Sequence, residues 1–201
     1  MKYLILIAIL FCSPAFADTL IIGDSISIGY TPFVQQESQT VVTHIPGNAK
    51  DTFNTLANIN EWLSVPNITV IHYNNGLWDA MRGTYASIGW ATCDLSKPTH
   101  SSLKEYRNNL EKIASILEST GAQIVWATTT PVPYGNKCVK ESDILYFNKI
   151  LRSVAREHGF EIDELFSLML PYQNLHAPST GVHYTEEGYQ LMSYQVNDSI
   201  R

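Results

Sequence analysis

A serine and a histidine near the two ends of the chain have the residue types of a nucleophile and its base. Ser25 stands in the segment GDSIS (residues 23–27), and His183 ends the segment GVH (residues 181–183). A serine hydroxyl is a weak nucleophile unless a base removes its proton, and imidazole is the common base near neutral pH. The pair therefore indicates nucleophilic catalysis by a serine. The alternative interpretation is a surface turn and a structural histidine.

The residues around Ser25 predict that this serine lies at a strand-to-helix turn. Residues 18–22 (DTLII) have the composition of a strand, and residues 26–36 that of a helix start. A hydroxyl at such a turn is exposed, and the N-terminus of the helix favours the negative charge that develops beside it. We expect Asp24 to cap this turn through backbone N–H groups and to take no part in proton transfer.

Strand-like and helix-like segments alternate along the rest of the chain. Residues 123–128 form a nearly continuous apolar run, which is typical of a strand buried on both faces of a parallel sheet. Strands are expected at 19–22, 40–44, 68–73, 123–128 and 160–162, and helices at 32–37, 52–63, 101–119, 142–158 and 186–196. The alternation predicts a three-layer α/β/α sandwich with a central parallel five-stranded sheet. In such sheets the working residues gather beyond the carboxyl ends of the strands.

The first 17 residues have the pattern of a secretory signal peptide. Lys2 is followed by an apolar run to Phe11, and the segment SPAFA (residues 13–17) predicts cleavage after Ala17. The apolar run is too short for a comfortable membrane span. We therefore expect an exported protein, periplasmic or secreted, in which residues 18–201 form a single domain.

The charge balance argues against polyanionic partners. The chain has 13 Lys and Arg against 19 Asp and Glu, for a formal net charge of −6. Without a basic stripe to neutralise phosphates, nucleic acid and anionic membrane are not expected partners. No Cys-x-x-Cys motif or clustered His, Cys and Asp spacing indicates a metal site. We expect a monomer that needs no metal and no cofactor.

Two cysteines, Cys93 and Cys138, follow the signal-like segment, both in loop-like stretches. The strands expected before them, at 68–73 and 123–128, are neighbours in a sequentially wound sheet, so both loops leave the same edge. An oxidising compartment would permit a disulfide between them, which we predict. Two unpaired thiols are the alternative.

Four landmarks, in order, resemble the motifs of the SGNH hydrolases, also called the GDSL esterase/lipase superfamily. Ser25 corresponds to the nucleophile of that family, and His183 corresponds to its base. Gly47, four residues before an Asp-Thr pair, corresponds to the glycine whose backbone N–H helps to form an oxyanion hole.

The fourth landmark is the segment HYNNGLWD (residues 72–79), which resembles the block whose asparagine side chain donates to the same oxyanion hole. Counting back from the Gly-Leu-Trp-Asp ending favours Asn74, whereas counting from the strand end selects Asn75. We favour Asn74. The oxyanion hole that the resemblance implies is then formed by Ser25, Gly47 and Asn74.

The resemblance implies a serine esterase that forms an acyl-enzyme on Ser25, with His183 as the base. It implies short-chain or O-acetyl esters as substrates, those of carbohydrates among them. An O-acyltransferase would use the same acyl-enzyme and transfer it to a hydroxyl group in place of water.

One position departs from the family pattern. The family usually carries Asp three residues before the histidine, and Thr180 stands there in this chain. Ser25 and His183 could act as a dyad, with Thr180 or a backbone carbonyl orienting the imidazole. Alternatively, Asp163 or Glu164 could supply the carboxylate. The departure also leaves open a non-catalytic or vestigial binding protein that keeps the fold.

Four aromatic residues, Trp78, Trp90, Tyr134 and Tyr172, lie in loops at the expected active edge. They could form a wall that binds a sugar or an acyl group, or they could be packing residues. The five other histidines are expected to be structural or solvated; they are His44, His72, His100, His158 and His176.

Overall fold

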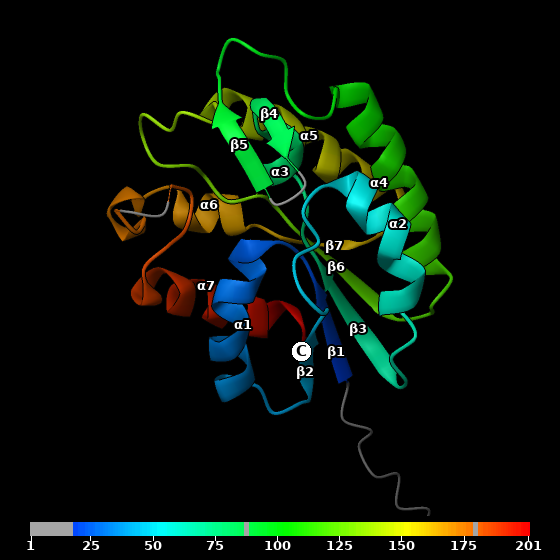
Figure 1. The fold of residues 1–201 in the computed structure, drawn as a ribbon. Coiled ribbons are helices and arrows are strands. Elements are labelled where there is room, and N and C mark those ends of the chain that lie inside the picture. The colour runs from blue at the N-terminus through cyan, green and yellow to red at the C-terminus, as the bar shows by residue number, and fades with distance from the viewer. Residues whose placement is uncertain (1–17, 87–88, 179–180) are drawn as a thin grey trace, which may run out of the picture.

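Five parallel strands form the centre of the molecule (Figure 1). The computed structural model describes residues 18–86, 89–178 and 181–201, so the predicted signal peptide lies outside the described residues. The strands are β1 (Asp18–Ile22), β2 (Val42–His44), β3 (Ile68–Tyr73), β6 (Gln123–Ala127) and β7 (Glu161–Asp163), in the spatial order β2-β1-β3-β6-β7. Every pairing is parallel, as in Ile21 opposite both His44 and His72. The predicted five-stranded parallel sheet is confirmed.

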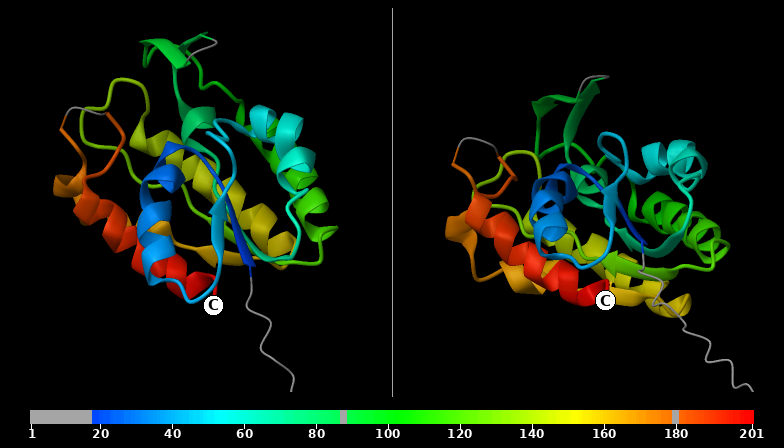
Figure 2. Two further views of the ribbon diagram at one scale, coloured as in Figure 1. Left: turned by 60° about the horizontal axis from the view of Figure 1, so that its bottom comes forward. Right: turned by 90° about the horizontal axis from the view of Figure 1, so that it is seen from below.

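Helices cover both faces of this sheet, as Figure 2 shows. The long helices are α1 (Ser25–Glu37), α2 (Thr52–Trp62), α4 (Leu103–Glu118), α5 (Glu141–Glu157) and α7 (Glu186–Ser199). On one face α1 packs against α7, and on the other α2 packs against α4 and α4 against α5. A right-handed crossover between parallel strands places the helices in this way, because the chain moves from β1 to one edge and then back across to the other.

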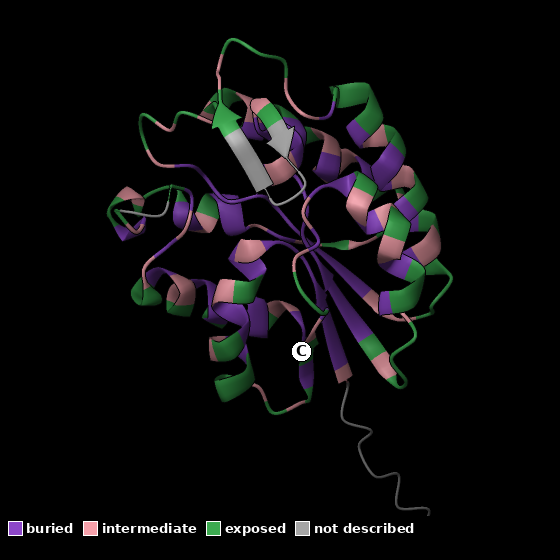
Figure 3. Ribbon diagram, in the orientation of Figure 1, coloured by how far each residue is buried: buried purple, intermediate pink, exposed green. Residues whose placement is uncertain are grey.

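The inner strands of the sheet are buried on both faces by these two helical layers (Figure 3). In β1 every residue from Thr19 to Ile22 is buried, and in β6 the same holds from Ile124 to Ala127. The apolar, β-branched composition of these segments suits strands that face packed helices on either side. The carboxyl ends of β1, β2 and β3 therefore emerge at one edge, from rigid supports.

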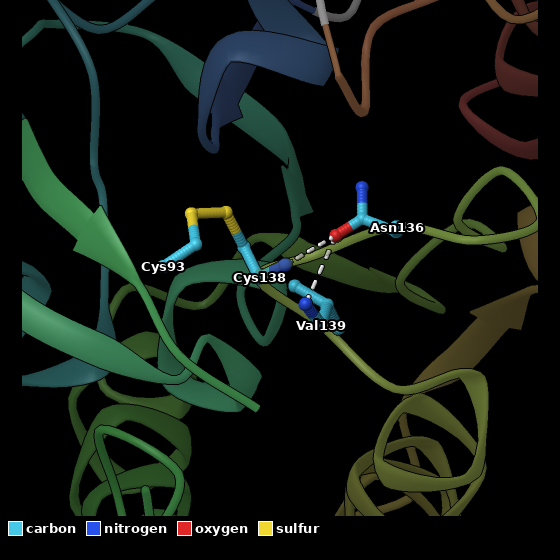
Figure 4. The surroundings of a disulfide bond; sticks show 4 residues. All are labelled: Cys93, Asn136, Cys138 and Val139. Atoms are coloured by element: carbon cyan, nitrogen blue, oxygen red, sulfur yellow. Dashed lines mark hydrogen bonds between the residues drawn. A yellow bond between two sulfur atoms is a disulfide. The ribbon is translucent and has the colours of Figure 1, made fainter. Parts of the chain in front are cut away.

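A short antiparallel hairpin stands above this edge of the sheet. It consists of β4 (Gly83–Ala86) and β5 (Gly89–Cys93), and it follows the single-turn helix α3 (Leu77–Ala80). Cys93 at its end forms a disulfide with Cys138 in the loop after β6, as predicted (Figure 4). The side chain of Asn136 braces that loop by accepting the backbone N–H groups of Cys138 and Val139, each at 2.9 Å.

Two further short elements lie between β7 and the last helix. They are α6 (Leu165–Met169) and the 3₁₀ turn η1 (Gln173–Leu175). After η1 the chain runs past His183 and enters α7, whose first turn is capped by the side chain of Thr185. Among the described residues, no helix has the length and apolar character needed to cross a membrane.

Candidate active site

Ser25 and His183 lie in hydrogen-bond contact at the carboxyl edge of the sheet. The Ser25 Oγ atom lies 2.8 Å from His183 Nε2, although 158 residues separate the two in the chain. Ser25 follows the turn after β1 and is the first residue of α1. Its backbone N–H therefore has no partner within the helix. The free N–H groups of this first turn lie at the positive end of the helix dipole, which favours a bound anion. This arrangement matches a nucleophile and its base.

Asp24 caps the helix that begins at Ser25, as expected. Its Oδ1 accepts the N–H of Ile26 at 2.9 Å, while Oδ2 is buried with no hydrogen-bond partner in the part of the chain that the structure describes. Burial raises the pKa of this carboxyl to about 7, against the opposing effect of the bond from Ile26. The Asp24 carboxyl, next to Ser25 in the chain, thus changes its charge near neutral pH.

Backbone hydrogen bonds fasten the turns after β1, β2 and β3 to one another. The N–H of Asn74 donates to the carbonyl of Ile22 at 2.8 Å, and the N–H of Ala49 donates to that of Gly23 at 2.9 Å. Gly47, in the same turn as Ala49, is exposed and has a φ of +75°, a conformation that favours glycine. The residues after these three strands therefore form one rigid rim beside Ser25.

Asn74 and Asn75 differ in what their side chains contact. Both ends of the buried Asn75 amide bind protein: Oδ1 accepts the hydroxyls of Thr55 and Tyr73 at 2.6 and 2.7 Å, and Nδ2 donates to the carbonyl of Lys50 at 2.9 Å. Asn74 Nδ2 donates once, to the carbonyl of Ala127 at 3.2 Å. Each amide nitrogen thus makes one hydrogen bond, and the difference lies in the oxygen: Asn75 is held at both ends of its amide, whereas Asn74 is held by its nitrogen alone among the described residues.

The carboxylates considered as a third member contact other residues. Asp163 is buried, lies 2.9 Å from His72 Nε2 through Oδ2, and accepts the side chain of Gln195 through Oδ1. Glu164 pairs with Arg152 through both oxygens, at 2.7 and 2.6 Å. The hydrogen bonds of both carboxylates are thus with side chains other than His183. Thr180, which was considered together with a backbone carbonyl, lies outside the described residues.

A second buried carboxylate, Asp79, supports the segment that contains Asn74. The sequence analysis did not single out this residue. Asp79 accepts the N–H and the hydroxyl of Thr52 at 3.1 and 2.7 Å, and the hydroxyl of Ser101 at 2.5 Å. Burial raises the pKa of Asp79 to about 6 despite these bonds. The side chain thereby joins α3 to the start of α2. Its place in the Gly-Leu-Trp-Asp segment was the available signal.

The remaining histidines have structural contacts. His44 lies 2.7 Å from Ser27 Oγ, and its pKa is lowered by burial. His100 lies 3.2 Å from Asp51, and the hydrogen bond to that carboxylate raises the pKa of the imidazole. His158 lies between two glutamates, and His176 lies 3.2 Å from the carbonyl of Pro131. None of these contacts includes Ser25 or His183.

Cavities lie against both sides of this edge. One, of about 670 Å³, is lined by Tyr134, Gln173, the disulfide and residues 176–178 and 181 of the loop before His183. Another, of about 340 Å³, is lined by Gly47 and by apolar residues that include Ile28 and Ile45. Both volumes are in the range of small-molecule sites.

The four aromatic residues considered as a binding wall do not share one cavity. Tyr134 is 81% exposed at the larger cavity, while Trp78 is partly buried against the core. Tyr172 lies in a different cavity, beside α7. The side chain of Trp90 lies outside the described residues. Of the three aromatic side chains that the structure describes, Tyr134 lines the cavity beside the loop before His183. Within the described ranges, no cluster of three or more His, Cys, Asp or Glu side chains is arranged to hold a metal ion.

Comparison with known proteins finds similarity in structure alone. No family model matches the sequence, and no curated protein is similar enough to match. Among solved structures, the lipase/acylhydrolase from Enterococcus faecalis is 17% identical, with a TM-score of 0.72, covering 91% of this chain and 94% of its own. The fold is that of the GDSL-type acylhydrolases.

Other solved structures agree with this assignment of the fold. A GDSL-like lipase from Parabacteroides merdae is 16% identical, with a TM-score of 0.72, over 91% of this chain and 94% of that one. An acetyl xylan esterase is 13% identical, with a TM-score of 0.70, over 92% of this chain and 100% of that one. The SGNH resemblance expected from the motifs is thus confirmed for the fold.

Proposed function

We propose that this GDSL-type chain is an exported serine esterase that hydrolyses carboxylic esters through an acyl-enzyme on Ser25. The observation that carries the proposal is the contact of 2.8 Å between Ser25 Oγ and His183 Nε2, at the start of a helix. The disulfide between Cys93 and Cys138 suits an oxidising compartment and supports export.

In the first half of the reaction, Ser25 Oγ attacks the ester carbonyl while its proton passes to His183 Nε2. The carbonyl oxygen then carries a negative charge, for which Ser25, Gly47 and Asn74 offer three N–H donors. Each donor in such a hole contributes about 3–4 kcal/mol in the transition state. His183 next gives its proton to the departing alcohol, and the acyl group stays on Ser25.

In the second half, water attacks the acyl-enzyme. His183 takes a proton from the water molecule, the same three donors hold the new oxyanion, and collapse releases the carboxylic acid. The proton on His183 returns to Ser25 Oγ. Besides the ester and water, the two halves use groups of this chain alone.

Short-chain or O-acetyl esters are the substrates that we propose, with the alcohol carried by a carbohydrate. The cavity beside Gly47, about 340 Å³ and partly apolar, could take a short acyl chain, and the cavity with Tyr134 could take the alcohol. The acetyl xylan esterase among the structural neighbours supports this choice of substrate class.

A fluorophosphonate probe tests the proposal, because it reacts with a serine that a base has activated. We expect one adduct, found by mass spectrometry on the peptide that contains Ser25. Ser25→Ala should not be labelled, and it should lose at least about 10³-fold in kcat on a 4-nitrophenyl ester. His183→Ala should react much more slowly with the probe. Ser193→Ala, a buried serine of α7, is the matched control and should be labelled normally.

An adduct on another peptide, or labelling that Ser25→Ala leaves unchanged, would contradict the assignment. Absence of labelling in a correctly folded protein would favour the non-catalytic alternative.

A further inference from the structure

A separate cavity lies between α7 and the segment around η1. Its volume is about 420 Å³, and it shares no lining residue with the cavities beside Gly47 and His183. Glu187, Gln190, Leu191 and Tyr194 line it from α7, and Tyr172 and Asn174 line it from the other side. The α7 residues are spaced by three and four positions, so they form one stripe on the helix surface.

The side chains of this cavity combine exposed aromatic rings with amides that are available for hydrogen bonds. Tyr172 is 41% exposed and Tyr194 is 51% exposed, and neither ring packs against another ring in the described part of the chain. Asn174 and Gln190 make no side-chain hydrogen bond to any residue that the structure describes, and both are exposed. Each amide offers both donors and an acceptor.

This combination fits a sugar ring better than a lipid or a peptide side chain. A pyranose has an apolar C–H face, which packs on an aromatic ring, and an edge of hydroxyl groups, which exchange hydrogen bonds with amides. Tyrosine suits such contacts because its ring is apolar and its hydroxyl stays hydrated. A site made for a lipid chain would instead be lined mainly by aliphatic side chains.

The charge of the cavity selects among sugars. Glu187 is the charged residue in its lining, and Glu186 precedes it in the first turn of α7. The whole chain has a formal net charge of −6. An anionic sugar would be repelled, whereas a hydroxyl group of a neutral sugar can donate a hydrogen bond to the carboxylate.

The position of η1 connects this cavity with the proposed ester site. Tyr172 and Asn174 line the cavity beside α7, while Gln173 and His176 line the one beside the His183 loop. The segment 172–176 is thus a wall between two cavities. A sugar chain whose ester lies at Ser25 could cross this wall and place a later residue between the two tyrosines.

We propose that the cavity formed by Tyr172, Asn174, Gln190 and Tyr194 is a distal binding site for a neutral oligosaccharide. The link to an acylated chain rests on the proposed esterase function, but binding of the sugar itself does not. The site would hold the carrier polysaccharide and so favour esters on long chains over esters on single sugars.

The site is tested by measuring the binding of unacylated oligosaccharides to residues 18–201. The probes are xylohexaose, cellohexaose and, as the anionic comparison, hexagalacturonic acid. We expect one or both neutral sugars to bind, with a Kd that rises at least fivefold in Tyr172→Ala and in Tyr194→Ala. Tyr194→Phe should bind nearly as well as the unaltered protein, because it keeps the ring. Calorimetry gives the Kd, and circular dichroism checks folding.

Tyr146→Ala is the matched control, because Tyr146 is 59% exposed on α5 and lines none of the three cavities described here. Its affinity for the sugars should be unchanged. No binding of either neutral sugar at millimolar concentration, equal binding of the anionic sugar, or equal loss in Tyr146→Ala would each overturn the proposal. Because the probes carry no ester, these results do not depend on Ser25.

Discussion

We propose different roles for the adjacent Asn74 and Asn75, because their hydrogen bonds differ. The amide of Asn75 is held at both ends, through two hydroxyls on its oxygen and one carbonyl on its nitrogen, whereas Asn74 makes one side-chain hydrogen bond among the described residues, from Nδ2 to Ala127. The order Asn-Asn in the sequence cannot distinguish them, because both follow β3 directly. The partners of Asn75 decide, and they come from α2, from β3 and from the loop at Lys50.

Substitution of each asparagine by alanine should separate activity from stability. Asn74→Ala should lower kcat on a 4-nitrophenyl ester by about 10²–10³-fold with little change in KM, as expected for loss of one oxyanion donor. Asn75→Ala should mainly lower the free energy of unfolding, because it leaves buried hydroxyls without an acceptor. Steady-state kinetics and urea denaturation measure both. Equal loss of kcat in two stably folded variants would contradict the assignment of Asn74.

Asp24 should make stability fall as the pH rises towards neutrality. Its pKa is about 7 in the folded protein, against a usual value of 3.8. Between about pH 4 and pH 7 the folded state therefore holds a proton that the unfolded state has lost, and each rise in pH favours unfolding. Asp24→Asn should reduce the loss of stability between pH 5 and pH 8 by on the order of 2 kcal/mol.

Urea denaturation of both proteins at the two pH values provides the measurement. Asp198→Asn, at an exposed aspartate near the C-terminus, is the control for removal of a charge. If Asp24→Asn and the unaltered protein lose stability in parallel, the raised pKa is refuted.

At the scale of elements, the sequence predicted the long strands and helices within a few residues but misjudged one buried face. Apolar spacing over residues 52–63 predicts that Phe53, Leu56, Ile59 and Leu63 face the core. In the structure, α2 buries Thr52, Thr55, Ile59 and Trp62, and Phe53 is exposed. Ile59 is buried, and Leu56 and Leu63 are partly buried against the core, so the exposed Phe53 is the exception. The buried threonines bond to Asp79 and Asn75, and these polar contacts widen the buried face beyond the apolar stripe.

The β4–β5 hairpin was not predicted for a different reason. Each strand has at most five residues, and their composition lacks the alternation that marks a half-buried strand. The disulfide at Cys93 and the pairing of Arg82 with Asp143 hold this hairpin to the loop after β6 and to α5. Long-range links of this kind leave no local signal in the sequence.

Removal of the disulfide should lower the free energy of unfolding, because the bond restricts the unfolded chain, and the effect grows slowly with the length of the closed loop. Cys93 and Cys138 are 45 residues apart, for which the loss of loop entropy corresponds to about 2–4 kcal/mol. The variant with both cysteines replaced by serine should unfold at correspondingly lower urea concentration. Intact mass with and without reductant verifies the bond. A variant as stable as the unaltered protein would show that the bond adds nothing.

At the scale of the whole molecule, one buried pair connects parts of the chain that are distant in sequence. Asp163 of β7 contacts His72 of β3 and Gln195 of α7, and His72 Nδ1 lies 3.4 Å from the hydroxyl of Tyr30 in α1. The side chains thus cross the sheet under the α1 and α7 layer. Neither the pair nor its partners could be predicted, because each residue is ordinary in its local sequence.

Asp163→Ala should destabilise the fold by about 3 kcal/mol or more, because it removes the carboxylate partner of the buried His72 and of the half-buried Gln195. Glu164→Ala is the matched control. It removes a partly exposed pair with Arg152, and it should cost no more than about 1 kcal/mol. Urea denaturation compares the two. Similar costs for both would show that the buried pair is no more important than the surface pair.

The separation of Ser25 and His183 in the chain has a consequence for when the protein can become active. Ser25 leaves the ribosome more than 150 residues before His183, and the two meet across 158 residues of chain. The helix after His183 must also dock against α1 to hold the loop in place. Contacts of such long range form late, because the closure entropy must be overcome first. The nascent and partly folded chain therefore has no assembled base for its serine, and reactivity towards a fluorophosphonate should appear only with the last step of folding.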